Sequence, residues 1–171
     1  MSNLKHWIWL SLRKGLTGQN CVRVLEHFGT PELVHAADEE AYRMVGGLTD
    51  AAIRSLMNKS LDQADVVLGD CERFGIQLLT RQDSTYPRLL KEIHQPPMVL
   101  YWKGRQIAFD TQVAIGMVGA REATPYGIQA ATKLSAELTR KGALVVTGMA
   151  QGIDAACVRG ALKVGGPVVS V

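Results

Sequence analysis

The sequence predicts an α/β protein in which an all-α N-terminal domain precedes an incomplete Rossmann-like parallel sheet. Apolar residues recur at helical spacing up to about residue 75. From Val113 onward, short apolar runs alternate with helical segments, which is typical of β-α-β units. The first two of these runs each end in a turn of small residues. We therefore expect a helical domain at 1–75, a connector with short strands and a helix at 76–112, and the first half of a Rossmann-like domain at 113–171.

The helical domain is expected to contain short helices that end at glycines. Apolar residues at helical spacing run from Leu12 to Phe28, and Gly29-Thr30-Pro31 ends that helix. Thr30 is a suitable N-cap for the next helix, with Pro31 at its first position. Further helices are predicted over 38–44, from Thr49 or Asp50 to Leu56, and from Ser60 to Phe74.

Two turns in this domain share a pattern that is typical of a helix-hairpin-helix. Leu16-Thr17-Gly18 and Gly47-Leu48-Thr49-Asp50 each place a hydrophobic residue and a glycine before a helix. Backbone N–H groups of such a turn can bind a DNA phosphate. Neither turn has the usual paired glycines or a following lysine, and the region is net acidic. A helical bundle without a ligand is therefore the preferred interpretation.

The connector combines two strand candidates with one short helix. The strand candidates are the apolar runs from Ile76 to Leu79 and from Met98 to Trp102. Tyr86-Pro87 and Pro96-Pro97 favour extended backbone just before each proline. Between these prolines, helical spacing predicts one short amphipathic helix with the apolar residues Leu89, Leu90 and Ile93.

The region from Val113 follows a β-α-β-α-β order. Val113 to Met117 is a continuous apolar run, as expected of a parallel strand buried on both faces. Right-handed crossovers place the third strand beyond the second, so one edge of the first strand stays open. Thr124 is a suitable N-cap for the first helix, Pro125 to about Lys141, which we expect to bury Ile128, Ala131, Leu134, Ala136 and Leu138. The later elements are predicted as a strand at 143–147, a helix at 153–164 and a strand at 167–171.

Two strand-to-helix turns of this region form the candidate site. Turns of small residues present backbone N–H groups at the positive end of a helix, and such groups bind phosphate without a metal. The candidate nucleic-acid-binding residues are Gly119, Ala120, Arg121, Gly127, Thr147, Gly148, Met149, Ala150, Gln151 and Gly152.

The site residues have different expected roles. The Arg121 guanidinium can make a bidentate phosphate contact, and Thr147 can offer a hydroxyl. Residues 149–152 can present their N–H groups, and Gly127 lets the first helix come close to the turn. Asp154 is expected only to cap its own helix, because a carboxylate that faced a phosphate would repel it.

Charge and cysteine content narrow the class of protein. Residues 1–80 hold 8 Lys/Arg and 10 Asp/Glu, whereas residues 81–171 hold 11 and 6, so the positive charge lies in the part with the candidate site. The three cysteines have no metal-ligand spacing and indicate buried thiols in a reducing compartment. The apolar run at 7–10 is too short to span a bilayer. We expect a cytoplasmic protein without a membrane partner.

The sequence lacks the patterns of common catalytic sites. The turns do not fit G-x-G-x-x-G, and no P-loop lysine is present. We find no His-x-x-x-His pair, acidic dyad or Ser/His/Asp set, and the four histidines lie outside the α/β region. We therefore expect a binding module and not an enzyme, with no catalytic residue, no metal and no cofactor.

The motifs together resemble the DNA-processing protein A family, called DprA or Smf. Its signature is similar to Val118-Gly119-Ala120-Arg121, to Tyr126-Gly127, and to the run from Thr147 to Asp154 that is followed by Gly160-Ala161-Leu162. Tyr86-Pro87 and the segment at 96–104 are similar to the family's lead-in. The helical N-terminus resembles its sterile-alpha-motif-like domain.

The resemblance implies a cytosolic bacterial protein that binds single-stranded DNA. Such proteins protect incoming strands in natural transformation and help to load the RecA recombinase onto them. The glycine turns and Arg121 would then hold backbone phosphates. RecA and a second copy of the chain, in a homodimer, are the protein partners that the resemblance implies.

Three departures from the family pattern leave alternatives open. Thr147 replaces a serine, and Cys157-Val158 replaces an Ala-His pair. The family's Rossmann-like domain is also longer than residues 113–171, so we expect a chain truncated within it. The absent half would carry further basic DNA contacts, the self-association surface and much of the RecA contact. The alternatives are a nucleotide-binding or nucleotide-hydrolysing Rossmann-like protein and an inert truncated family member.

Overall fold

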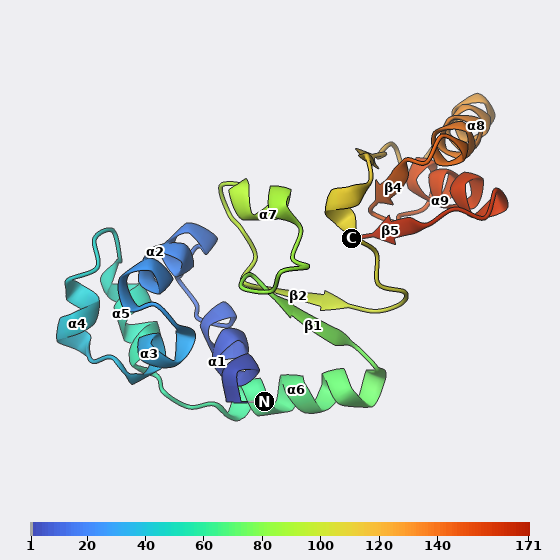
Figure 1. Cartoon of the computed structure of the whole chain (residues 1–171). Coiled ribbons are helices and arrows are strands. Elements are labelled where there is room, and N and C mark those ends of the chain that lie inside the picture. Colours follow the sequence, from blue (N-terminus) through green and yellow to red (C-terminus); the bar gives the residue numbers. More distant parts are fainter. Residues whose placement is uncertain (1) are drawn as a thin grey trace. The chain divides into compact units, whose positions relative to one another are not determined.

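The computed structural model describes residues 2–171, which form two compact units that divide between Gln106 and Ile107 (Figure 1). The first unit joins a group of helices to a two-stranded sheet. Its elements are α1 (Ser2–Ser11), α2 (Gly18–Phe28), α3 (Pro31–Ala36), α4 (Glu39–Arg43), α5 (Asp50–Met57), α6 (Asp62–Phe74), β1 (Gln77–Thr80), α7 (Arg88–Glu92) and β2 (Val99–Trp102).

Threonine N-caps fix the start of three helices in this unit. The hydroxyls of Thr17, Thr30 and Thr49 each accept the backbone N–H of the residue three positions later. The caps predicted at Thr30 and Thr49 are thereby confirmed. The sequence predicted one helix from Leu12 to Phe28, and the start of that prediction is wrong. Helix α2 begins only at Gly18. Gly15 has a positive φ of 81° in the preceding turn, so the helix does not extend through it.

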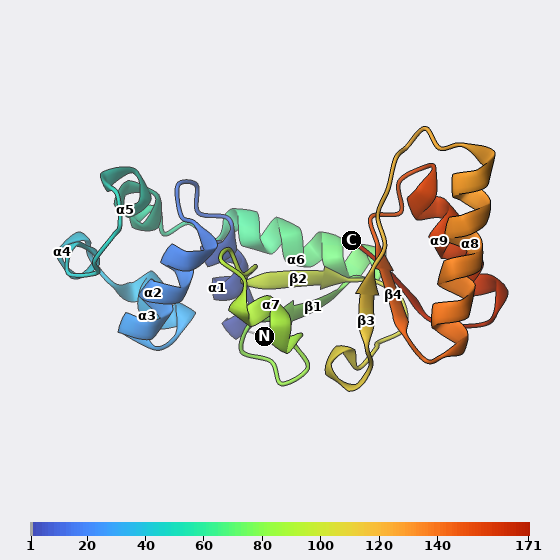
Figure 2. The same ribbon diagram turned by 90° about the horizontal axis from the view of Figure 1, so that it is seen from above.

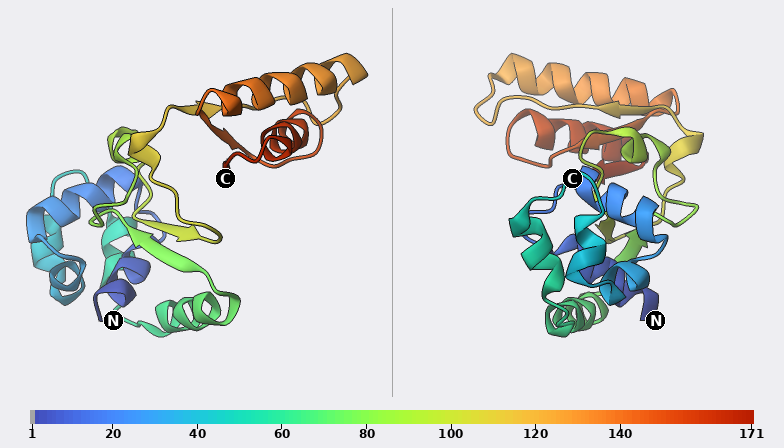
Figure 3. Two further views of the ribbon diagram at one scale, coloured as in Figure 1. Left: turned by 45° about the vertical axis from the view of Figure 1, so that its right-hand side comes forward. Right: turned by 90° about the vertical axis from the view of Figure 1, so that its left-hand side faces the viewer.

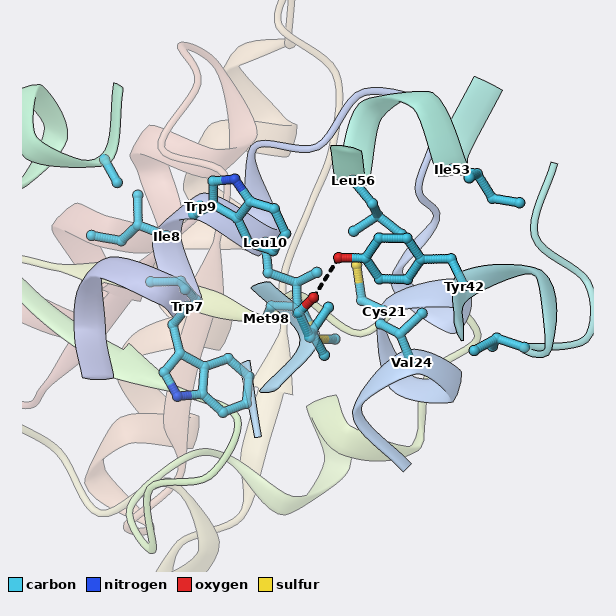
Figure 4. Packing of buried hydrophobic residues seen from close by; sticks show 14 residues of the cluster. Trp7, Ile8, Trp9, Leu10, Cys21, Val24, Tyr42, Ile53, Leu56 and Met98 are labelled. Atoms are coloured by element: carbon cyan, nitrogen blue, oxygen red, sulfur yellow. Dashed lines mark hydrogen bonds between the residues drawn. The ribbon is translucent and has the colours of Figure 1, made fainter. Parts of the chain in front are cut away.

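The core of the first unit lies among its helices (Figure 4). The Trp9 indole is fully buried and donates a 2.9 Å hydrogen bond to the Asn58 carbonyl. The buried Tyr42 hydroxyl donates to the Val34 carbonyl, the contact that is dashed in Figure 4. Both polar groups are therefore satisfied inside an apolar cluster. Its other buried members include Trp7, Ile8, Leu10, Cys21, Val24, Ile53, Leu56 and Met98.

Strands β1 and β2 pair in antiparallel register and pack on this helical core. Gln77 lies opposite Trp102 and Thr80 lies opposite Val99. Met98 and Val99 belong to the same buried cluster as the helices. The Tyr86 hydroxyl donates a 2.7 Å hydrogen bond to the Pro97 carbonyl and so holds the segment between the strands.

The second unit is a three-stranded parallel sheet with order β3-β4-β5. Ile115 pairs with Val145, and Val145 pairs with Val168, so the three strands share one register. The predicted β-α-β-α-β order and the predicted position of the third strand are confirmed. The elements are η1 (Phe109–Thr111), β3 (Ala114–Gly116), α8 (Pro125–Arg140), β4 (Leu144–Thr147), α9 (Ile153–Lys163) and β5 (Val168–Ser170).

Helices α8 and α9 lie next to each other on one face of this sheet (Figures 2 and 3). Two right-handed crossovers in the same direction place both helices on the same side. Gly160 allows their close approach, because a Cβ there would lie 2.1 Å from Ser135 Oγ and 2.2 Å from the Thr132 carbonyl oxygen. The buried contacts of this layer come from Ala131, Val145, Ala156, Cys157 and Ala161.

Two burial predictions for this unit are wrong. The first strand was expected to be buried on both faces, but Ala114 and Gly116 are exposed and Val113 is 70% exposed. It is an edge strand, and both helices lie on a single face of the sheet, so its apolar sequence does not ensure burial. Leu134 was expected in the core of the first helix, yet it is 55% exposed and lies outside the buried cluster.

Cys21, Cys71 and Cys157 are free and buried, which confirms the prediction that they act as small hydrophobic residues. Burial raises the pKa of the Cys21 thiol to about 12. The pKa of the Cys157 thiol is also raised, mainly by burial and to a smaller extent by the nearby Asp154. Within residues 2–171, none of the helices is both long enough and apolar enough to span a bilayer.

Candidate functional site

The two glycine turns of the second unit are in direct contact. One turn follows β3 and contains Gly119, Ala120 and Arg121, and the other follows β4 and leads into α9. The Ile153 backbone N–H donates a 3.1 Å hydrogen bond to the Ala120 carbonyl, which joins the start of α9 to the first turn. The structure therefore brings together residues that are about thirty positions apart in the chain. We call these two segments, 119–121 and 147–152, the paired turns.

Two glycines make this contact possible. A Cβ at Gly152 would lie 2.3 Å from the Ala120 carbonyl oxygen and 2.4 Å from that of Arg121. Gly152 also has a φ of +87°, which an L side chain rarely adopts. A Cβ at Gly119 would lie 2.6 Å from Ile153 Cβ. Both positions therefore need glycine for the packing of the paired turns, whatever ligand they hold.

Gly127 lies at the first turn of α8 and also faces Ile153. A Cβ at Gly127 would lie 3.4 Å from Ile153 Cδ1, so the space there is narrow but not closed. The Gly127 N–H donates a 3.1 Å hydrogen bond to the hydroxyl of Thr124, the N-cap that the sequence predicted. The start of α8 is thereby held close to the start of α9.

Asp154 has a different role from the one expected. It was predicted to cap its own helix, but the Asp154 carboxylate accepts a 3.0 Å hydrogen bond from the Gly119 backbone N–H. Gly152 occupies the N-cap position of α9 and supplies no side-chain cap. Asp154 is buried, and its carboxylate contacts the first turn, in a residue that lies 35 positions earlier in the chain. Spacing along one helix could not show this partner.

The paired turns hold unused hydrogen-bond donors. Within residues 2–171, the backbone N–H groups of Ala120, Arg121 and residues 149–152 donate no hydrogen bond. Met149 has a φ of +55°, an uncommon backbone conformation outside glycine, and its side chain is 59% exposed. Consecutive free N–H groups in a turn before a helix suit an anion.

Arg121 and Gln151 are exposed polar side chains of the paired turns, and Thr147 is a buried one. Arg121 is exposed, and none of the ion pairs among residues 2–171 involves it. The Thr147 hydroxyl is buried at the end of β4 and has no hydrogen-bond partner within the same residues. An exposed guanidinium beside free N–H groups suits a phosphate, whereas the Thr147 hydroxyl is shielded from solvent and does not face a ligand in this arrangement. Glu122 is also exposed, next to Arg121, and is the negative charge of this turn.

Comparison with known proteins decides the family. A sequence profile of the family described as DNA recombination-mediator protein A matches residues 77–171, which is more than half of the chain. This chain belongs to the DprA family. The matched region includes the β1–β2 sheet and all of the second unit, with the paired turns.

Relatives in the DprA family align with most of the chain. Protein Smf of Synechocystis is 32% identical over 99% of this chain and 44% of its own length. The DNA processing protein DprA of Bacillus subtilis is 33% identical over 71% of this chain and 41% of its own length. The crystal structure of DprA from Streptococcus pneumoniae has a TM-score of 0.70 and 26% identity, and it covers 98% of this chain and 56% of that chain. The chain thus spans less than half the length of these two curated relatives.

Proposed function

We propose that this chain binds single-stranded DNA and acts as a recombination mediator in natural transformation. The observation that carries this proposal is the set of free N–H groups in the paired turns, next to the free Arg121 guanidinium. These donors suit a phosphate, and membership of the DprA family makes DNA the preferred source of that phosphate. Of the residues expected from the sequence, Ala120, Arg121 and 149–152 are proposed to contact DNA. Gly119 and Gly127 are proposed to shape the site, because their N–H groups already donate to Asp154 and Thr124.

The mediator role extends this binding site to a protein partner. A mediator of this kind protects the bound strand and assists the loading of RecA recombinase onto it. We place RecA and a second copy of the chain among the partners because the chain belongs to the DprA family. We propose a binding protein and not an enzyme, and we assign a structural role to the buried Asp154 next to the paired turns, because its carboxylate accepts the Gly119 N–H.

Fluorescence anisotropy with a labelled oligo-dT tests the proposal directly. Binding should weaken as salt rises from about 50 mM to about 200 mM, because bound phosphates release their counterions. A duplex of the same length should bind more weakly, and a mononucleotide should not displace the oligonucleotide. The absence of binding at micromolar protein would contradict the proposal. Displacement by mononucleotide would instead favour a protein that acts on free nucleotides.

A further inference from the structure

Tyr126 is the most exposed aromatic side chain within residues 2–171, and no predicted role explains it. The side chain is 80% exposed, whereas Phe74 and Tyr101 are exposed by 51% and 49%. The other two tyrosines, Tyr42 and Tyr86, are buried in the first unit. A single exposed aromatic ring is ordinary, but an exposed ring that lies with other exposed apolar side chains beside a candidate site is typical of a binding surface.

The backbone around Tyr126 is fixed beside the paired turns. Pro125 is the first residue of α8, and Thr124 caps that helix through the Gly127 N–H. Gly127 in turn faces Ile153, the residue whose own N–H binds the Ala120 carbonyl. Tyr126 therefore lies at a capped helix start, next to Gly127, which faces the residue that joins the paired turns. An aromatic ring on a fixed backbone loses little conformational entropy when it makes a contact.

Other apolar groups are exposed at the same end of the sheet. Val118, directly before Gly119, is 79% exposed, and Met149 is exposed in the second turn. Polar donors for an anion thus lie next to apolar surface for a flat, uncharged group. Inorganic phosphate or a phosphorylated sugar would use only the donors. A nucleotide strand with unstacked bases would use both, because each unit carries a phosphate and an aromatic face.

We infer that Tyr126 is a stacking surface for a base of the single strand whose phosphates bind the paired turns. The inference rests on the proposed function, and it gives a physical reason for tighter binding to a single strand than to a duplex. In a duplex the faces of the bases are covered by their neighbours, so only a single strand can place a base on the ring. Base stacking has little dependence on sequence, because every base has an aromatic face. The Tyr126 hydroxyl is not required for this contact.

The test compares two ligands with the same phosphates. One is a labelled oligo-dT, and the other is an abasic oligonucleotide of equal length. Tyr126→Ala should weaken binding to oligo-dT roughly 5- to 100-fold, in line with alanine substitution at stacked bases. It should leave binding to the abasic strand unchanged, and Tyr126→Phe should bind both as the unmodified chain does. Arg121→Ala should weaken binding to both ligands, because it removes a phosphate contact.

The outcomes separate this inference from the proposed function. Tyr126→Ala with unchanged oligo-dT affinity would overturn the stacking role and leave DNA binding intact. Equal losses on both ligands would also overturn it, since the substitution would then act through the shape of the turn. An unmodified chain that binds neither ligand would contradict the proposed function itself. Circular dichroism of each variant checks that the second unit remains folded.

A photochemical measurement gives an independent readout that does not depend on affinity. Oligonucleotides with 5-iodouracil form crosslinks to aromatic side chains that stack on the base. Trypsin cleavage after Arg121 and Lys133 releases the peptide 122–133, in which Tyr126 is the sole aromatic residue. The crosslink should appear on this peptide and disappear in Tyr126→Ala. A crosslink confined to other peptides would overturn the inference.

Discussion

The Gly119 backbone N–H donates a 3.0 Å hydrogen bond to the Asp154 carboxylate, and this contact joins the two turns of the candidate site. The Gly119 donor is thereby fixed in position instead of facing solvent or ligand. Its carboxylate partner is buried and lies in the first turn of α9. An acidic residue next to the candidate site therefore stabilises the shape of the two turns and leaves the neighbouring N–H groups free.

Asp154→Ala should loosen the first turn and destabilise the second unit. The substitution leaves a partly buried N–H without an acceptor, which costs about 1–3 kcal/mol. Asp154→Asn keeps an acceptor oxygen and should lose less. Hydrogen exchange of the Gly119 amide is the direct measurement, because its protection should fall in the alanine variant and persist largely in the asparagine variant. Unchanged exchange in Asp154→Ala would contradict this contact.

Gly152→Ala should damage the paired turns far more than a comparable glycine substitution elsewhere. Gly142 offers the control: its φ is +86°, close to the +87° of Gly152, but a Cβ there would meet nothing within 4 Å. Gly142→Ala should therefore cost only the backbone strain of about 1–2 kcal/mol. Gly152→Ala adds a collision with two carbonyl oxygens and the further strain of a ψ of −127°, and should cost about 3 kcal/mol or more.

Far-UV circular dichroism in urea measures this pair of variants. Trp7, Trp9 and Trp102 all lie in the first unit, so tryptophan fluorescence does not report on the second. In the Gly152→Ala variant, the second unit should unfold at a lower urea concentration. The unfolding transition followed by tryptophan fluorescence should stay at the same urea concentration. Equal destabilisation by the two substitutions would show that the strain, and not the contact between turns, requires glycine at Gly152.

Local signals in the sequence were sufficient for much of the fold. Caps at Thr30, Thr49 and Thr124 depend on bonds to residues three positions away, so a short window contains both partners. The strand order of the second unit follows from alternating elements and the handedness of crossovers. These features could be predicted because each depends on neighbours in the chain or on a general rule of chain geometry.

Features that depend on distant residues could not be predicted in the same way. The sequence predicted that Asp154 caps its own helix. Its hydrogen-bond partner instead lies 35 positions away, in the other turn, and no local window of sequence contains both residues. The exposure of β3 depends on which faces of the sheet are covered, and not on its own apolar sequence. Tyr126 was recognised as part of a motif, but its exposure becomes evident only when the start of α8 is placed in space.

Tyr42 should make the first unit less stable at high pH. Burial, with a smaller contribution from Asp38, raises the pKa of Tyr42 from 10.0 to about 12. Between these values the unfolded chain has released the proton and the folded chain has not, so the free energy of unfolding falls with rising pH. Below pH 10 this stabilisation is fully present. The loss should reach at most about 3 kcal/mol, since one pKa unit corresponds to about 1.4 kcal/mol.

Tyr42→Phe isolates this contribution from other groups. The Lys59 Nζ lies 2.6 Å from the Tyr42 hydroxyl, and burial lowers the pKa of Lys59. The titration of Lys59 therefore raises the free energy of unfolding as pH rises towards 10.5, which is opposite to the effect of Tyr42. The Tyr42→Phe variant should be less stable at neutral pH by about 1–2 kcal/mol, because Lys59 and the Val34 carbonyl lose a partner. Urea unfolding followed by tryptophan fluorescence should then show a smaller decline above pH 10 in this variant. Parallel declines in both chains would exclude Tyr42 as the titrating group.

Arg121→Ala should weaken binding to single-stranded DNA by about 1–3 kcal/mol, because it removes a charged hydrogen bond at a phosphate. The loss of one phosphate contact should also reduce the salt dependence of binding by about 0.7 in the log–log slope. Arg121→Lys should fall between the two, because an ammonium keeps the charge but not the bidentate geometry. The exposed neighbour Glu122 supplies the matched control, and Glu122→Gln should bind at least as tightly as the unmodified chain. Anisotropy with oligo-dT across a salt series measures all four proteins, and equal affinity of Arg121→Ala and the unmodified chain would remove Arg121 from the site.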